Sequence, residues 1–291
     1  MNKVLFALVA LVSSMPAFGA LPTTNSPELQ LVRTIRTNPF SGTAVSAQDP
    51  EGSDFIDADE FWFAGDKGSL RAFRITTNGT LVQSISRTTF SNAPRFGGGP
   101  IAGSNRTGDF ESIAFAGNLL HIFSGTCCST TTIPAVFRMN RSGGNIVYRD
   151  LPSGSDFPAA ATRSGVIYVG TGKTIRTYNF STNVLGPVLN ISGLAGNILG
   201  MDFTPSGSDL LVVTTQERLF RVNPGNKMVV SGWNLDLTVA EGNPTGIRDA
   251  RAVVVVPVAG QDDQIYVSDG SETRPVGDPL RYAVFVFNVL P

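Results

Sequence analysis

The feature that most constrains the fold of this chain is an internal repeat. The segment DPEGSDFIDADEFWFAG, Asp49 to Gly65, aligns without a gap over DFESIAFAGNLLHIFSG, Asp109 to Gly125. In this register Glu51 lies over Glu111, and an aspartate stands two residues before each glutamate. Repeats of this kind are typical of architectures in which one small sheet is copied around an axis. The repeat also predicts a matching acidic pair at the same point of each copy.

Strand signals recur in sets of four, separated by short turns rich in Gly, Asn, Ser and Pro, and long helical periodicity is nearly absent. The second strands of the sets are apolar runs: FWFAG from Phe61, LHIFSG from Leu120, VIYVG from Val166, LLVVT from Leu210 and IYVSDG from Ile265. Their starts are 59, 46, 44 and 55 residues apart, a spacing that brackets that of propeller blades. We therefore predict an all-β chain that forms a single β-propeller with five blades of four antiparallel strands.

The last blade needs a strand from elsewhere, because the fifth set contains only three strands. An unpaired strand, QLVRTIR from Gln30 to Arg36, stands before the first blade. Pairing this N-terminal strand with the last blade would close the ring and cover an exposed sheet edge. Six blades would require a further blade in Ser91 to Gly108, whose Gly, Pro and Asn content disfavours strands.

The N-terminus has the pattern of a secretory signal peptide. One early cation, Lys3, precedes an apolar run from Val4 to Val12 and a small-residue exit that ends at Ala20. A membrane-spanning helix would need about 20 apolar residues, and this run is far shorter. We predict a signal peptide over 1–20, a propeller domain over 21–291, and a secreted or periplasmic location without a membrane span.

The charge pattern bears on the class of partner. The formal net charge is −1, and the Lys and Arg residues are scattered along the chain. Nucleic-acid binding is disfavoured, because it requires a clustered basic surface. We predict a monomer whose partner is a small molecule or a protein.

The connections between strands sort onto two faces, because successive antiparallel strands reverse direction. The loops from strand one to two and from strand three to four share the lower face and are mostly tight turns. The upper face receives the crossings between blades and the loops from strand two to three. Its longer segments are Thr37 to Gln48, Ser91 to Gly108, Thr126 to Ile133 and Asp269 to Leu280. Length and irregularity favour the upper face as the binding face.

The inner strands line the central channel, and polar residues recur where these strands begin. The first position reads Asp49, Asp109, Asp156, Asn197 and Asp249, and two residues further on stand Glu51, Glu111, Pro158, Leu199 and Arg251. Carboxylates that converge would raise one another's pKa unless a cation were present. A calcium ion, with six to eight oxygen ligands, would resolve the conflict. The predicted metal ligands are Asp49, Glu51, Asp109, Glu111, Asp156 and Asp249. Alternatively, these carboxylates accept hydrogen bonds from backbone amides of the neighbouring blade and lock the blades together.

The DPEG and DFES segments, followed by second strands that end in VSDG or SGT, resemble those of secreted propellers of the phytase-like and esterase-like class. More loosely, they resemble six-bladed propellers of the NHL type. The phytase-like resemblance implies calcium-dependent hydrolysis of phosphate or carboxylic esters. It implies metal ligation by the acidic pairs of the first two blades and an anionic substrate facing Arg251, with Arg248 and Arg274 as further basic candidates.

A second enzymatic hypothesis is glycoside cleavage, because five-bladed propellers host furanosidases that place two carboxylates on either side of a sugar. Glu51 and Glu111 are the candidate pair, although the two copies are chemically alike and show no asymmetry between an acid and a base. The catalytic candidates are therefore Glu51, Glu111 and Arg251.

Three further residues carry reactive side chains. Cys127 and Cys128 are adjacent in the upper-face segment SGTCCSTTT, and in an oxidising compartment a strained vicinal disulfide is expected. This disulfide could clip the loop, contact a ligand, sense redox state or give way to an interchain bond. His121, the sole histidine, aligns with Phe61 and is predicted to be a packing residue rather than a catalytic base.

Overall fold

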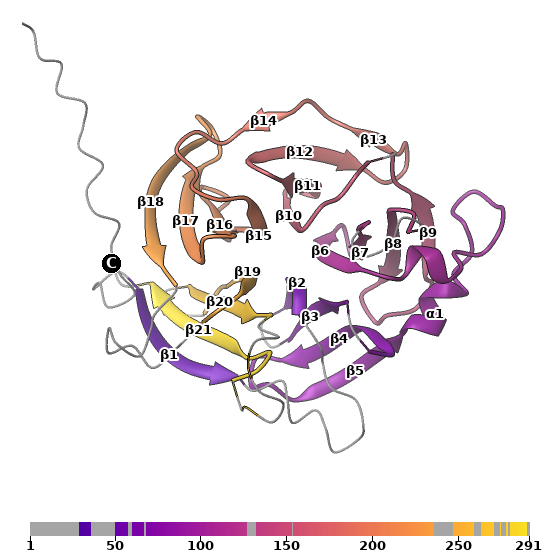
Figure 1. Ribbon diagram of the computed structural model, residues 1–291, viewed down its shortest axis with the longest axis horizontal. Coiled ribbons are helices and arrows are strands. Elements are labelled where there is room, and N and C mark those ends of the chain that lie inside the picture. The colour runs from indigo at the N-terminus through magenta and orange to yellow at the C-terminus, as the bar shows by residue number, and fades with distance from the viewer. Residues whose placement is uncertain are drawn as a thin grey trace, which may run out of the picture.

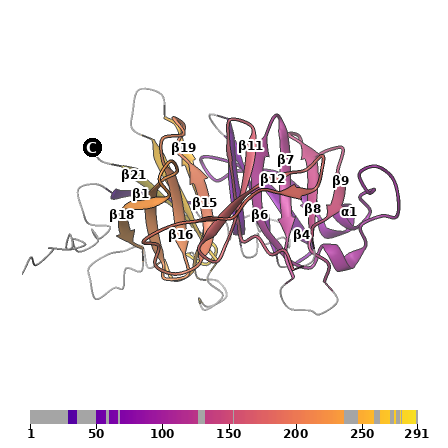
Figure 2. The same ribbon diagram turned by 90° about the horizontal axis from the view of Figure 1, so that it is seen from above.

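The strand sets of the sequence each fold into one sheet of a ring. The computed structural model describes residues 29–35, 50–57, 60–66, 68–126, 132–152, 154–235, 247–258, 263–270, 274, 278 and 280–289. These residues form five antiparallel sheets arranged around a central axis, as Figure 1 shows. Figure 2 shows the strands running between the two faces of the ring. The predicted five-bladed β-propeller is confirmed.

Each blade begins with its inner strand. The first blade contains β2 (Pro50–Asp57), β3 (Glu60–Gly65), β4 (Leu70–Thr76) and β5 (Leu81–Ser86). The second contains β6 (Phe110–Ala116), β7 (Leu119–Ser124), β8 (Ala135–Asn140) and β9 (Val147–Asp150). The third contains β10 (Ala159–Arg163), β11 (Val166–Thr171) and β12 (Thr174–Asn179), with an outer strand split into β13 (Val184–Leu185) and β14 (Leu189–Asn190). The fourth contains β15 (Ile198–Phe203), β16 (Leu210–Thr214), β17 (Arg218–Asn223) and β18 (Met228–Asn234).

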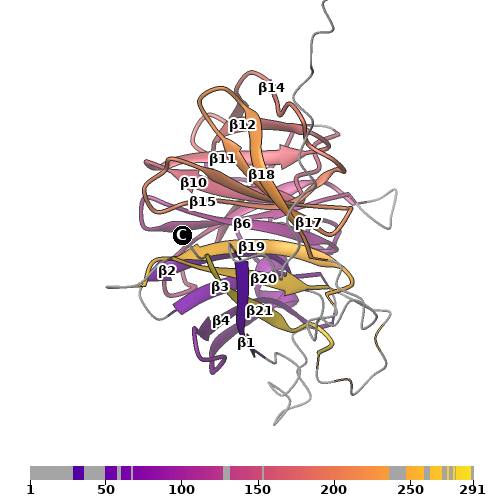
Figure 3. The same ribbon diagram turned by 90° about the vertical axis from the view of Figure 1, so that its left-hand side faces the viewer.

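The fifth blade joins the two ends of the described chain. It consists of β19 (Ala250–Val256), β20 (Gln264–Asp269), β21 (Val284–Val289) and the N-terminal strand β1 (Leu29–Ile35), in the order β1-β21-β20-β19. Figures 1 and 3 show β1 beside β21, the antiparallel pairing predicted from the sequence. Arg33 donates from Nη2 to the hydroxyl of Tyr266 at 2.9 Å and ties β1 to the blade. The ring is thus closed by hydrogen bonds between strands from opposite ends of the sequence.

The crossing from the first to the second blade forms no further blade. It contains a short helix, α1 (Arg87–Ser91), and a 3₁₀ turn, η2 (Ser104–Arg106). Between them, Arg95 forms an isolated parallel bridge with Tyr148 on the outer edge of the second blade. The crossing therefore covers a sheet edge, which excludes the six-bladed alternative.

Apolar side chains between neighbouring blades form the core. Between the first and second blades, Trp62, Phe90, Phe110 and Phe137 are fully buried. The ring of Phe90, from α1, meets Phe110 edge-on at a centroid distance of 4.8 Å and Phe137 at 5.3 Å. Because a fully buried aromatic side chain contributes about 1.5–3 kcal/mol, α1 stabilises the contact between the two blades.

The gapless alignment of the two repeats holds for the inner strands but not for the second strands. Asp54 and Ala114 are equivalent in that alignment, yet Asp54 pairs with Trp62 whereas Ala114 pairs with His121. An irregularity near the lower end of β2 adds one residue to the first blade. The counterpart of His121 is therefore Trp62, and the alignment with Phe61 was wrong by one residue.

No helix within the described ranges is long and apolar enough to cross a membrane. The predicted signal peptide, 1–20, lies outside these ranges.

Candidate functional site at the upper mouth of the channel

The inner strands bring polar side chains of four blades together at the upper mouth of the channel. Five carboxyl groups and one guanidinium gather there, which we call the mouth cluster: Glu51, Asp109, Glu111, Asp156, Asp249 and Arg251. The sequence predicted this convergence from the repeat. Asp49 lies outside the described residues, and so do Cys127 and Cys128. Asn197 is exposed, and its backbone N–H donates to Thr215 Oγ1 at 3.0 Å.

Arg251 links two blades through a chain of ion pairs. Its Nη1 lies 3.2 Å from Oε2 of Glu51, which is 7% exposed. Its Nε and Nη2 contact the two carboxylate oxygens of Asp249 at 2.8 Å and 2.9 Å. A two-pronged contact of this kind fixes the plane of the guanidinium. Arg251 is thus held between β19 and β2 by two carboxylates.

Glu111 and Asp156 both lie against Gly125. A Cβ atom at Gly125 would stand 2.9 Å from Glu111 Oε1 and even closer to Asp156 Oδ1, so a side chain there would displace both carboxyl groups. Burial raises the pKa of Glu111 to about 9, and a hydrogen bond to Asp109 and the negative charges of Asp109 and Asp156 add to the shift. Arg251 opposes the shift without cancelling it. Glu111 is therefore protonated at neutral pH and donates to Asp109.

Asp156 carries the same signature from the third blade. Burial, followed by the charge of Asp109, raises the pKa of Asp156, while a hydrogen bond from the backbone of Thr126 lowers it. That hydrogen bond joins the third blade to the second. Asp156 thus combines the blade-locking role with membership of the mouth cluster.

The other predicted basic candidates lie apart from the cluster. Arg274 is 6% exposed, and its Nε contacts Asp269 at 3.2 Å while its Nη1 lies 3.6 Å from Asp278. Asp269 in turn accepts the backbone N–H of Asp249 at 3.1 Å. The ion pair of Arg274 with Asp269 therefore helps to position Asp249, which belongs to the mouth cluster. Arg248 is exposed.

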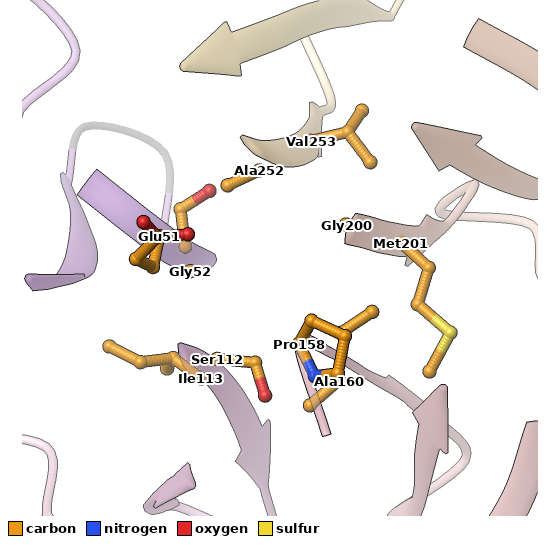
Figure 4. Close-up of a pocket in the computed structure, with 12 residues that line it drawn as sticks. Glu51, Gly52, Ser112, Ile113, Pro158, Ala160, Gly200, Met201, Ala252 and Val253 are labelled. Carbon is orange, nitrogen blue, oxygen red and sulfur yellow. The ribbon is translucent and has the colours of Figure 1, made fainter. Parts of the chain in front are cut away.

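The channel is closed directly below the mouth. Figure 4 shows a cavity lined by residues of all five inner strands, with Glu51 at its edge and Pro158, Gly200 and Ala252 around it. Its volume is about 10 Å³, which is room for about one water molecule. A ligand at the upper mouth would therefore rest on a floor of packed strands.

A second carboxyl pair, absent from the predictions, lies deeper in the channel. Asp54 on β2 accepts the backbone N–H of Phe115 on β6, and Asp202 on β15 accepts that of Val255 on β19 at 2.8 Å. Burial raises the pKa of Asp54 to about 7 and, together with the charge of Asp54, raises that of Asp202. Hydrogen bonds to backbone amides of the neighbouring blade, expected at the strand starts, are thus made here by residues further along the strands.

His121 is buried, as expected for a packing residue. Its ring meets Phe180 edge-on at 5.5 Å, and burial and the charge of Arg138 lower its pKa to about 4. It is therefore neutral at physiological pH.

The mouth cluster does not by itself provide a metal site. Over the described part of the chain, no group of three or more His, Cys, Asp or Glu residues is placed to hold a metal ion. Calcium takes six to eight oxygen ligands, so a calcium site at the mouth would need further ligands beyond these side chains, and the predicted ligand Asp49 lies outside the described ranges.

Comparison with known proteins places the fold but not the activity. No family model and no curated protein sequence matches the chain. Among solved structures, the glutaminyl cyclase of Myxococcus xanthus is similar, with a TM-score of 0.59 and 12% identity over 90% of this chain and 97% of that one. The hydrazine synthase of Kuenenia stuttgartiensis matches with a TM-score of 0.41 and 11% identity, over 81% of this chain and 60% of the other. No family model supports the resemblance to the phytase-like class. At this identity the likeness to the cyclase is one of fold: a five-bladed β-propeller.

Proposed function

We propose that this protein binds a small ligand carrying a positively charged group at the upper mouth of the channel. The observation that carries the proposal is the convergence of five carboxyl groups from four blades at the upper mouth. Burial and two neighbouring aspartates raise the pKa of one of them, Glu111, to about 9. Five carboxyl groups face one guanidinium, which is already paired with two of them. Groups with strongly shifted pKa values occur often at functional sites, because binding and catalysis need carboxyl groups with a particular protonation state.

A cation at the mouth would relieve this unfavourable balance. It would favour the ionised form of Glu111, so that binding releases a proton below about pH 9. A primary ammonium group suits the cluster, because it donates three hydrogen bonds and the cluster is rich in acceptors. Calcium, the alternative cation, would need additional oxygen ligands from outside the described residues.

Calorimetry on the full chain tests the proposal with two probes, a panel of primary amines and calcium chloride. In buffers of different ionisation enthalpy at pH 8, binding should release up to about one proton, and affinity should rise by up to about tenfold per pH unit between pH 6 and 9. Glu111→Gln should abolish the proton release and weaken binding. The matched control is Glu60→Gln. This carboxylate lies on β3, apart from the mouth cluster, and its Oε2 pairs with Arg74 Nε at 2.9 Å. Affinity that is independent of pH and unchanged in Glu111→Gln would contradict the proposal, and the probe that binds identifies the cation.

A second candidate function is acid–base catalysis at the same mouth. It is favoured by the hydrogen bond between a protonated Glu111 and Asp109, since a donor and an acceptor held together can deliver and remove a proton. The similar fold of a glutaminyl cyclase makes peptides with an N-terminal glutamine the first substrates to try, with release of ammonia as the assay. Chromogenic phosphate esters, carboxylic esters and furanosides test the hydrolase hypotheses. Any turnover that belongs to this mouth should fall at least about a hundredfold in Glu111→Gln.

We also propose that the protein is exported, on the basis of the signal-like pattern over 1–20. N-terminal sequencing of protein recovered from the periplasm or medium should begin after Ala20.

A further inference from the structure

We propose that a groove between the second and third blades, at the lower face, binds a small organic oxyanion such as a carboxylate or a phosphate ester. The groove has a volume of about 590 Å³, within the range of ligand sites. Three lower-face turns border it, at Gly117, Gly165 and Thr182, so it opens on the opposite face from the mouth cluster. In Figure 1 this is the boundary where β13 approaches β9.

Two arginines of the second blade provide the positive charge. Arg138 on β8 lines the groove, and its guanidinium lies 4.6 Å from the ring centroid of Phe96 and 4.4 Å from that of Phe180. Arg149 on β9 lies over the same two rings, at 4.6 Å and 5.6 Å. The two rings thus hold two like charges beside each other.

These two guanidinium groups have no carboxylate partner within the described part of the chain. Arg149 donates from Nη2 to the backbone carbonyl of Ser181 at 2.8 Å. The guanidinium of Arg138 contacts the two rings and, among the described residues, forms no side-chain hydrogen bond. Asp150, the nearest acidic residue in sequence, is paired with Arg95 and Arg106 instead. Burial lowers the pKa of Arg138, and the nearby positive charge of Arg149 lowers it further. An oxyanion would relieve that repulsion and use the paired N–H donors of Arg138.

The rest of the lining indicates an organic rather than a bare anion. Leu119, Ile167, Val184 and the rings of Tyr178 and Phe180 line the groove, so an apolar or aromatic body would be covered while its charge meets Arg138. Buried His121 also lines the groove, and within the described part of the chain its Nδ1 has no hydrogen-bond partner. Such a nitrogen offers a second polar contact to a ligand.

Calorimetry with phenyl phosphate and benzoate tests the groove, with inorganic phosphate and benzylamine as comparisons. At least one of the two aromatic anions should bind more tightly than both comparisons and more weakly at high salt. Arg138→Gln should weaken binding at least tenfold, whereas Arg281→Gln, which removes an arginine stacked at 4.9 Å on Tyr282 in the fifth blade, should not. The preferred anion distinguishes a carboxylate ligand from a phosphate ligand.

A steric variant keeps the test decisive if Arg138→Gln fails to fold. Val184 is 58% exposed and lines the groove, so Val184→Trp should block it with the guanidinium groups intact. Val188 is 52% exposed and is not part of the lining, so Val188→Trp is the matched control. The proposal is overturned if neither aromatic anion binds better than benzylamine, or if Val184→Trp and Arg138→Gln both leave the affinity unchanged.

Discussion

The buried carboxyl of Asp54 should make the stability of this protein fall as pH rises. Its pKa is about 7 in the folded chain, against an ordinary value of 3.8, because burial disfavours the charged form. The folded state therefore holds the proton more tightly than the unfolded state does. Between pH 3.8 and about 7 the free energy of unfolding should fall by about 1.4 kcal/mol per pH unit on account of this group. The total loss is about 4 kcal/mol, complete above about pH 7.

Asp54→Asn removes this loss while it keeps an oxygen that can accept the backbone N–H of Phe115. The variant should match the wild type near pH 4 and exceed its free energy of unfolding by up to about 4 kcal/mol at pH 8. Urea unfolding at half-unit steps from pH 4 to 8.5, followed by tryptophan fluorescence, measures the difference. The pH dependence of this difference is more informative than its value at one pH, because a change in packing caused by the substitution would be the same at every pH.

In a matched control variant, the free energy of unfolding should change in the opposite direction. Asp209 is paired with Arg221 at 2.7 Å, so Asp209→Asn loses an ion pair and should cost up to about 1 kcal/mol at neutral pH. A free energy of unfolding for Asp54→Asn that lies below wild type at pH 8, or a difference that does not change with pH, would refute the reasoning about Asp54.

Other perturbations test the packing of the ring. Gly52→Ala should destabilise the protein by several kcal/mol, because a Cβ would clash with the backbone of β6 at Ser112. Gly108→Ala should be nearly neutral, because its Cβ would make only ordinary contacts near 3.7 Å. Thermal melts compare the two variants. Phe90→Ala should cost about 3–5 kcal/mol in chemical unfolding, since the ring is fully buried between two blades. Deletion of β1, Leu29–Ile35, should expose the edge of β21, lower the melting temperature and cause association that size-exclusion chromatography detects. A variant that stays monomeric with an unchanged melting temperature would contradict closure of the ring by β1.

The blade pattern could be predicted from the sequence because it depends on local signals. Apolar strand runs, turn residues and a regular spacing are all visible along the chain. The fifth set lacked an outer strand, so the unpaired strand before the first blade was expected to pair there, and it does so beside β21. The register of the second strands could not be predicted in the same way. One residue near the lower end of β2 is absorbed in an irregularity, and an alignment of sequences cannot show which residue leaves the ladder.

The mouth cluster was predictable in its location but not in its pairing. Equivalent positions of a circular repeat must meet around one axis, so Glu51 and Glu111 were expected near each other. Whether Arg251 pairs with Glu51, with Asp249 or with both depends on distances between blades that no linear pattern contains. The arginines of the lower groove were missed for the same reason, because Arg138 reaches Arg149 only through the pairing of β8 with β9.

The deeper pair was visible in the sequence as a second, shorter repeat. GSDF, from Gly52, and GMDF, from Gly200, place a glycine two residues before each buried aspartate. The structure explains this spacing: a Cβ at Gly52 would stand 2.8 Å from Ile113 N, and one at Gly200 would stand 2.8 Å from Ala252 Cα. Each glycine therefore lets its inner strand approach the inner strand of the following blade.

This close approach is also the cause of the raised pKa values. Where two inner strands touch, the aspartate two residues further on is shut off from water and has a backbone amide of the next blade as its partner: Phe115 for Asp54, and Val255 for Asp202. The glycine and the aspartate thus act together. The close contact between the blades also removes water from the carboxyl group, which disfavours its charged form and raises its pKa. Because the charge of Asp54 contributes to the shift of Asp202, the first and fourth blades are coupled across the channel, although they are not neighbours in the ring.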